Sequence, residues 1–303
     1  MTTILRRHFC FVSVLLLFLC VFACKVSEDA AAAARQMTTT AVDLSSHYNS
    51  LAQAVTDSIA LNELDASISK IPFEAKDRRP LEDTLSEISK RKDAALALAK
   101  LAASMSALSS STVSSEVGTA ASALGKELVD MKALPAGSPV PDAVGQAGKF
   151  LLQFVQQHKE KEAAQAMNGT LAAFVFLFEK EKPTYDSIFR TYIFLASQIA
   201  RDLIARRAVD PSPMLTPALK PFDLTPLPAD AQLRDTLQAL ALGRLQTSAE
   251  DASKRETDAS SAMLSALEEM RSRVHLLATE KPMPIRDNPF SLKIVESWVA
   301  SAI

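Results

Sequence analysis

The chain has 303 residues, and its 33 basic and 35 acidic side chains nearly cancel to a net charge of −2 at pH 7. This balance gives no electrostatic reason to expect nucleic-acid binding. Only seven glycines occur, far below the usual share of about 7 percent, whereas Ala, Leu, Ser, Lys, Glu and Gln are abundant. Because alternating runs of β-branched residues are also missing from the sequence, it predicts an all-α fold with no sheet.

The first 24 residues have the pattern of a bacterial export signal. Arg6 and Arg7 precede an apolar run over residues 9–23, and small Ala23 lies directly before Cys24. Fifteen residues are too few to cross a bilayer of roughly 30 Å as a helix, which takes about 20, but they suit a signal peptide. Residues 21–24, Val-Phe-Ala-Cys, resemble the lipobox of bacterial lipoproteins. The resemblance implies cleavage after Ala23 and a lipid on Cys24, which anchors a chain without crossing the membrane.

Two other interpretations of this segment stay open. Ordinary cleavage near Ala23 or within residues 30–34 would leave a free periplasmic protein, and an uncleaved segment would act as an anchor. Residues 6–9, Arg-Arg-His-Phe, also resemble the middle of a twin-arginine signal, which would imply export of an already folded chain.

Cysteine usage and the residue after Cys24 agree with the lipoprotein resemblance. Cys10 and Cys20 lie inside the apolar run, so a chain beginning at Cys24 keeps one cysteine and has no internal disulfide. Lys25 occupies the position where Asp would retain a lipoprotein in the inner membrane of some Gram-negative bacteria. The resemblance therefore implies the outer membrane, with the protein facing the periplasm.

Proline clusters divide the rest of the chain, because proline removes a backbone donor and interrupts helices. The predicted architecture is an elongated antiparallel bundle of about six long helices with a coiled-coil-like hairpin. The predicted segments are a signal peptide at 1–23, a tether after the lipidated cysteine at 24–40, a helical bundle at 41–209, a Pro-rich strap at 210–228, and a long C-terminal helix with a short terminal helix packing on the bundle at 229–303.

The first three helices are predicted from apolar residues at spacings of three and four. The first runs from about Thr40 to Ile71, the second opens at Pro80, and the third ends at Leu134-Pro135, with Ser109 to Ser111 interrupting the last two. Their stripes include Leu44, Tyr48, Leu51 and Val55, then Leu61, Leu64, Ile68 and Ile71, then Leu81, Leu85, Ile88, Leu98 and Leu101, and finally Val117, Leu124, Leu128 and Met131.

The most apolar part of the chain follows. A fourth helix is predicted to begin after Pro141 and to end at Asn168-Gly169, because both residues tolerate a left-handed helix terminus. Residues 171–178 and a segment opened by Pro183 then form a helical hairpin that is apolar almost all round. A helix of that kind must be surrounded by other helices or by lipid, so we place the hairpin at the centre of the bundle. Its predicted core side chains are Phe174, Phe178, Phe189 and Tyr192.

The C-terminal third lacks proline from residue 229 to residue 281, which allows one very long helix. Small and apolar residues keep heptad spacing along it, as in a coiled-coil hairpin. They are Leu242, Leu245, Ala249, Ala252, Ala259, Met263, Ala266 and Met270. Asn288 before Pro289 is expected to cap a short terminal helix bearing Phe290, Ile294 and Trp298.

The sequence offers no recognisable catalytic set. His47, His158 and His275 belong to separate predicted helices without a ligand at metal-site spacing, so we expect surface or boundary positions. Neither a nucleophile-elbow motif nor a Gly-rich phosphate loop occurs. Arg190 and Arg201 are expected to form ordinary ion pairs with acidic neighbours, Asp186 in the case of Arg190, and the charge runs at 159–162 and 179–182 to be solvated.

These patterns predict a membrane-anchored lipoprotein of the bacterial cell envelope that is a non-catalytic helical binding or scaffold protein. Its expected partners are membrane lipid through Cys24, and either an envelope protein or a second copy, but not nucleic acid. No cofactor or metal is expected. The alternative is a soluble periplasmic helical protein that carries a small ligand or cofactor in its aromatic core.

Overall fold

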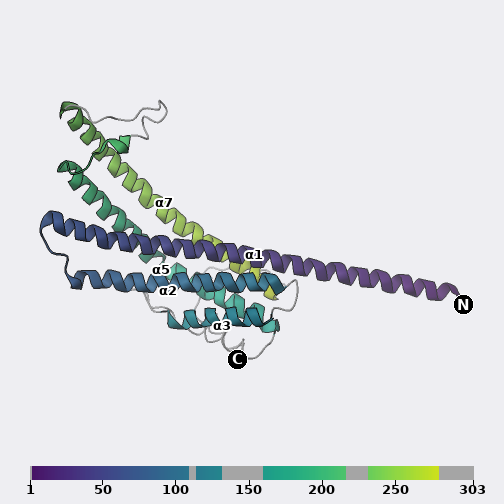
Figure 1. Ribbon diagram of the computed structural model, residues 1–303. Coiled ribbons are helices and arrows are strands. Elements are labelled where there is room, and N and C mark those ends of the chain that lie inside the picture. Colours follow the sequence, from purple (N-terminus) through teal and green to yellow (C-terminus); the bar gives the residue numbers. More distant parts are fainter. Residues whose placement is uncertain (1, 109–113, 132–159, 216–230, 280–303) are drawn as a thin grey trace.

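The computed structural model describes residues 2–108, 114–131, 160–215 and 231–279, and every regular element in these ranges is helical (Figure 1). The α-helices are α1 (Thr2–Ser69), α2 (Ala75–Leu108), α3 (Ser114–Asp130), α5 (Glu160–Ala205) and α7 (Ala231–Thr279), and η1 (Ser212–Leu215) is a short 3-10 helix. For the described residues, the predicted all-α fold without a sheet is therefore confirmed.

The helices form two antiparallel pairs. α2 packs along α1, α7 packs along α5, and α3 lies against α2. Figure 1 shows the two pairs close together along the middle of α1 and diverging toward the α1–α2 turn, while the N-terminal part of α1 extends beyond all the other helices. The bundle is elongated for this reason.

The first helix is longer at its N-terminus than the sequence indicates. The sequence places its start near Thr40 and leaves open whether Ala30 to Ala34 extend it or act as a tether; in the structure α1 includes residues 24–40. Ala33 and Ala34 are buried, and so is Met37, which lies about one turn further along the same face. Alanine has the highest helix propensity, so the Ala-rich stretch continues the helix instead of ending it. At its other end, α1 closes at Lys70, whose φ of 60° is left-handed.

The apolar stripe of α1 is buried only where the helix pairs are close. Leu44, Tyr48 and Leu51 are fully buried, as predicted, and they pack with the α2 stripe that includes Ile88 and Leu98. Leu64 and Ile71 belong to the same predicted stripe but are exposed, Ile71 to 69%. Their periodicity is helical, but the second helix pair has already diverged from this end of α1.

α5 is a single helix, so the predicted hairpin is wrong. Asn168-Gly169 does not end a helix: α5 continues through both residues, and the side-chain amide of Asn168 is 3.0 Å from Nδ1 of His275 on α7. Pro183 lies inside α5 and is exposed, as is Glu179, whose carbonyl loses its helical partner. An unpaired carbonyl on the solvent side costs little because water can bind it.

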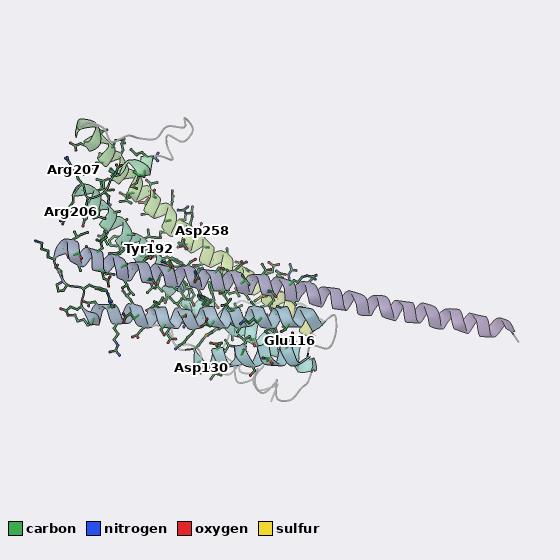
Figure 2. The ribbon with its side chains drawn as sticks, in the orientation of Figure 1. Glu116, Asp130, Tyr192, Arg206, Arg207 and Asp258 are labelled. Atoms are coloured by element: carbon green, nitrogen blue, oxygen red, sulfur yellow. The ribbon has the colours of Figure 1, made fainter. Side chains whose placement is uncertain are left out.

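The predicted centre of the bundle is confirmed for three of its four aromatic residues. Phe174, Phe178 and Phe189 are 1%, 0% and 5% exposed, in a run of α5 that is buried from Thr170 to Phe178. Tyr192 is half-buried at the edge of the core. Burial and the nearby charge of Asp57 raise the pKa of Tyr192. Tyr192 lies where α5 begins to leave α1 (Figure 2).

The open end of α5 is tied to α7 by surface contacts. Arg206 and Arg207 lie at this end (Figure 2), and Nη2 of Arg207 donates to Oδ1 of Asp235 at 2.8 Å. From the predicted strap, η1 packs on α7, where Nη1 of Arg244 donates to the carbonyl of Met214.

The long proline-free helix expected near the C-terminus is α7. The remainder of the strap, most of the fourth predicted helix, His158 and the terminal helix lie outside the described residues. Of the helices with described side chains, none is both long enough and apolar enough to cross a membrane.

Truncating Phe174 or Phe189 to Ala should lower the free energy of unfolding by about 3 to 5 kcal/mol, because each ring fills a closely packed core. Phe194→Ala is the matched control: it lies on the same helix but is 59% exposed, and should cost less than about 1 kcal/mol. Urea unfolding followed by circular dichroism measures all three. Losses below about 1 kcal/mol for both core variants would contradict the assignment of these rings to the core.

Candidate functional site

The most unusual feature of the core is a pair of fully buried, oppositely charged side chains. Arg91 of α2 is 0% exposed and Glu181 of α5 is 0% exposed. Arg91 continues the α2 stripe between Ile88 and Leu98, and Glu181 continues the α5 stripe between Phe178 and Tyr185. Helical periodicity therefore turns both charges inward, toward each other.

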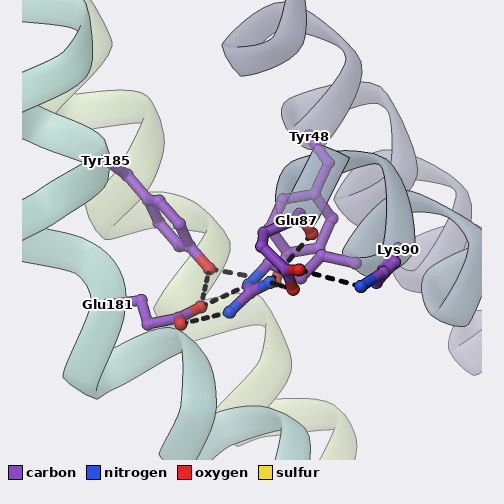
Figure 3. A network of polar contacts seen from close by, with 6 residues as sticks. Tyr48, Glu87, Lys90, Glu181 and Tyr185 are labelled. Atoms are coloured by element: carbon purple, nitrogen blue, oxygen red, sulfur yellow. Dashed lines mark hydrogen bonds and ion pairs between the residues drawn. The ribbon is translucent and has the colours of Figure 1, made fainter. Parts of the chain in front are cut away.

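Their geometry is that of a bidentate ion pair (Figure 3). Nε of Arg91 donates to Oε2 of Glu181 at 2.6 Å, and Nη2 donates to Oε1 at 2.5 Å. Nη1 donates to the backbone carbonyl of Glu87 at 2.8 Å. Each of the three guanidinium nitrogens thus has an acceptor, which a buried charge requires to offset its lost hydration.

Two tyrosines and a surface pair complete the network. The hydroxyl of Tyr185 donates to Oε2 of Glu181 at 2.6 Å, and the hydroxyl of Tyr48 on α1 lies 3.5 Å from that of Tyr185. Lys90 donates to Oε1 of Glu87 at 2.8 Å and reaches the edge of the bundle (Figure 3). The network therefore connects α1, α2 and α5 at the point where the helix pairs meet.

Burial and pairing fix the charge states of the network. Burial alone would lower the pKa of Arg91, but its hydrogen bonding with Glu181 outweighs this and raises the pKa above its ordinary value. Burial raises the pKa of Tyr48 and of Tyr185, and the neighbouring groups Tyr48 and Glu181 raise that of Tyr185 further. Both tyrosines are therefore neutral hydrogen-bond donors at neutral pH, and the charge remains on the Arg91–Glu181 pair.

Aromatic rings surround the same place. The rings of Tyr48, Phe178 and Tyr185 are in mutual contact, with centroids 5.3 to 6.4 Å apart. The imidazole of His47 joins them, 5.4 Å from Phe178 and 6.0 Å from Phe189. We expected His47 at the surface or boundary, and this is wrong, because the ring is only 9% exposed. An imidazole between two apolar positions, Leu44 and Leu51, was the available signal.

Sequence reasoning also missed Glu181 and Arg91. We assigned Glu181 to a solvated run of mixed charges at 179–182, but the run obscured its spacing of three from Phe178 and four from Tyr185. Arg91 stands three residues after Ile88 and seven before Leu98, so it also lies on an apolar stripe. Stripe positions predict burial whether the residue is apolar or charged, and this signal was not used.

The other residues that the sequence singled out are not part of this network. Asp186 pairs with Lys182 at 2.7 Å and not with Arg190 as expected, and Arg190 and Arg201 are exposed. His275 is half-buried on α7 beside Asn168. Among the described residues no three His, Cys, Asp or Glu side chains are grouped to hold a metal ion.

Ala23 and Cys24 lie in the N-terminal part of α1, at least 24 residues before Tyr48 of the network on the same helix.

Comparison with known proteins finds no family model, curated protein or solved structure that matches the chain. The function is therefore argued from the residues themselves. The side chains of the network are enclosed and bond to one another, so the network holds α1, α2 and α5 in one fixed arrangement.

Removing one charge of the buried pair should be costly. Glu181→Gln removes the bidentate carboxylate and leaves Arg91 only the carboxylate of Glu87, whose Oε2 is 3.6 Å from Nη1, so it should lower the free energy of unfolding by about 3 kcal/mol. Replacing both, as Arg91→Met with Glu181→Leu, should restore most of that loss because no unpaired charge remains. Denaturant unfolding of the two single variants and the double variant measures the coupling.

A surface ion pair between helices supplies the control. Arg207 and Asp235 join α5 to α7 at 2.8 Å, but their side chains are 59% and 63% exposed. Asp235→Asn should change stability by less than about 1 kcal/mol, since water screens this pair. Equal effects of Asp235→Asn and Glu181→Gln would contradict a special role for the buried pair.

Proposed function

We propose that the protein is a bacterial envelope lipoprotein, anchored by lipid on Cys24, that acts as a non-catalytic helical scaffold or binding protein. One observation carries the proposal: Arg6 and Arg7, an apolar run of signal-peptide length, and Ala23 directly before Cys24. The proposal places the protein on the outer membrane facing the periplasm, because Lys25 follows the cysteine.

The form of α1 supports a scaffold role. The same helix contains Cys24 and continues to Ser69, so its length between them is about 70 Å at about 1.5 Å per residue. Among the side chains that the structure describes, burial in the bundle is seen from Ala33 onward, nine residues beyond Cys24. An anchor at Cys24 would therefore hold the bundle close to the membrane and present the α1–α2 turn far from it.

The packing of the aromatic core favours a scaffold over the alternative, a carrier of a small ligand or cofactor. Tyr48, Phe178 and Tyr185 contact one another directly, and their polar atoms bond to Glu181 or to each other. Side chains that satisfy one another in this way are suited to structure. Absorbance of the purified native protein beyond that of its tyrosines and tryptophan would instead favour the carrier.

Cys24→Ser should abolish lipid attachment, because acylation requires the thiol. Cells given labelled palmitate should incorporate it into the wild-type protein and not into this variant, which should stay unprocessed or leave the membrane fraction. Cys20→Ala is the matched control, since residue 20 is removed with the signal. Unchanged labelling, size and fractionation of Cys24→Ser would refute the lipoprotein proposal.

Lys25→Asp tests the membrane to which the protein is sorted. If the lipoprotein pattern applies, the wild-type protein should sediment with the outer membrane and the variant with the inner membrane on a density gradient of cell envelopes. Lys25→Arg keeps the charge and should behave like the wild type. Identical gradients for Lys25→Asp and wild type would leave the lipid anchor in place but contradict the assigned outer-membrane location.

A further inference from the structure

His47 is enclosed by aromatic rings that come mainly from one face of α5. Its ring centroid lies 5.4 Å from Phe178, 6.0 Å from Tyr185 and 6.0 Å from Phe189, and 6.2 Å from its neighbour Tyr48. The α5 residues are spaced seven and four apart, so they form one stripe that faces α1. The imidazole is therefore part of the contact between the two helix pairs.

The groups around His47 are poorly arranged to hold a positive imidazolium. Its Nε2 is buried and makes no hydrogen bond within the described part of the chain. The charged groups that act on it, Asp186 and Lys182, are both on α5 and are paired with each other at 2.7 Å. Lys182 thus neutralises much of the attraction of Asp186, whose buried Oδ1 has no partner among the described residues.

The charged groups of the buried network are paired with one another, Glu87 with Lys90 at 2.8 Å and Arg91 with Glu181. Arg91 from α2 and Glu181 from α5 form a bidentate pair whose charges cancel. Tyr185 from α5 already donates its proton to Glu181, and Tyr48 is held beside Tyr185. Neither tyrosine is ionised near neutral pH, since burial raises the pKa of each.

We propose that His47 is an acid-sensitive joint: uptake of a proton by its ring weakens the packing of α5 on α1, while the α1–α2 pair stays together. The α1–α2 pair stays together because of where the His47 ring lies. All of its aromatic neighbours belong to α1 or α5, whereas α1 and α2 are joined through a separate apolar stripe that includes Leu44, Ile88 and Leu98. This inference rests on packing alone and stands whether or not Cys24 carries lipid.

The sign of the effect follows from burial. Desolvation lowers the pKa of His47 from 6.5 to about 4, against an upward effect of Asp186 and a downward effect of Lys182. The stability due to the neutral ring is therefore complete above about pH 6.5 and is lost as pH falls toward 4. Between pH 8 and pH 5 this shift lowers the folding equilibrium constant about thirtyfold.

The test compares the full chain with His47→Phe, which keeps an aromatic ring in the enclosure but cannot titrate. Between pH 8 and pH 5, urea unfolding should show the folding constant of the wild type falling about thirtyfold further than that of His47→Phe. His275→Gln removes a half-buried histidine on α7 and should retain the wild-type pH dependence. The same pH dependence in His47→Phe and in the wild type would overturn the proposal.

Two measurements on the wild type locate the effect. In the wild type with labelled histidines, the imidazole resonance that is absent from His47→Phe should titrate near pH 4, below its ordinary 6.5. Amide exchange at pH 5 should be faster in the α5 segment 178–189 than at pH 7 after correction for intrinsic rates, with α2 protected at both. A titration midpoint of His47 near 6.5, or equally fast amide exchange in α2 and α5 at pH 5, would overturn the proposal.

Discussion

The buried ion pair between Arg91 and Glu181 is the constraint on which the helix arrangement depends. Apolar stripes such as those of α2 and α5 pack in more than one register, because a shift of one turn replaces one apolar side chain by another. Two buried charges allow no such shift, since each would lose its counter-charge in a medium where that loss is very costly. The bidentate geometry narrows the choice further, because both Nε and Nη2 must meet the two carboxylate oxygens. The pair therefore restricts where α5 can lie along the α1–α2 pair.

The rest of the central packing follows from that register. With Glu181 fixed, Tyr185 stands one turn further along α5, within 2.6 Å of the carboxylate and beside Tyr48 of α1. Phe178 lies nearly one turn in the other direction and contacts both tyrosines and His47. The ion pair therefore orders α1 as well as α2, although α1 contributes no charge to it. Toward the α1–α2 turn the helix pairs separate. There Leu64, near the end of α1, and Ile71, in the turn, stay exposed.

How much the sequence could predict depends on whether a property is local. Helix content and the burial of Phe174, Phe178 and Phe189 follow from composition and spacing, and they agree with the structure. The breaks expected at Asn168-Gly169 and Pro183 were wrong because both depend on tertiary surroundings: Asn168 bonds to His275, 107 residues away, and Pro183 lies on the exposed side of α5. Arg91 and Glu181 are 90 residues apart, so each one looks like a surface charge until its partner is in place. Their positions on apolar stripes indicate that both side chains are buried, but the sequence does not indicate that they pair with each other.

α1 connects the two proposals. It packs against α2, α5 and α7, it contains His47, and its N-terminal part contains Cys24, where the sequence predicts a lipid. A helix is stiff over the span of about 14 Å between residue 24 and Ala33, which is the first buried residue among the described side chains. An anchor at residue 24 would therefore orient the helix on which the other pair is packed. Weakening the α1–α5 contact at His47 would then loosen the packing of α5 on the helix that the anchor orients, while the α1–α2 pair stays attached to the anchor. The asymmetry arises from chain order alone: the helix that is nearest the anchor is also the one that contains the titrating ring.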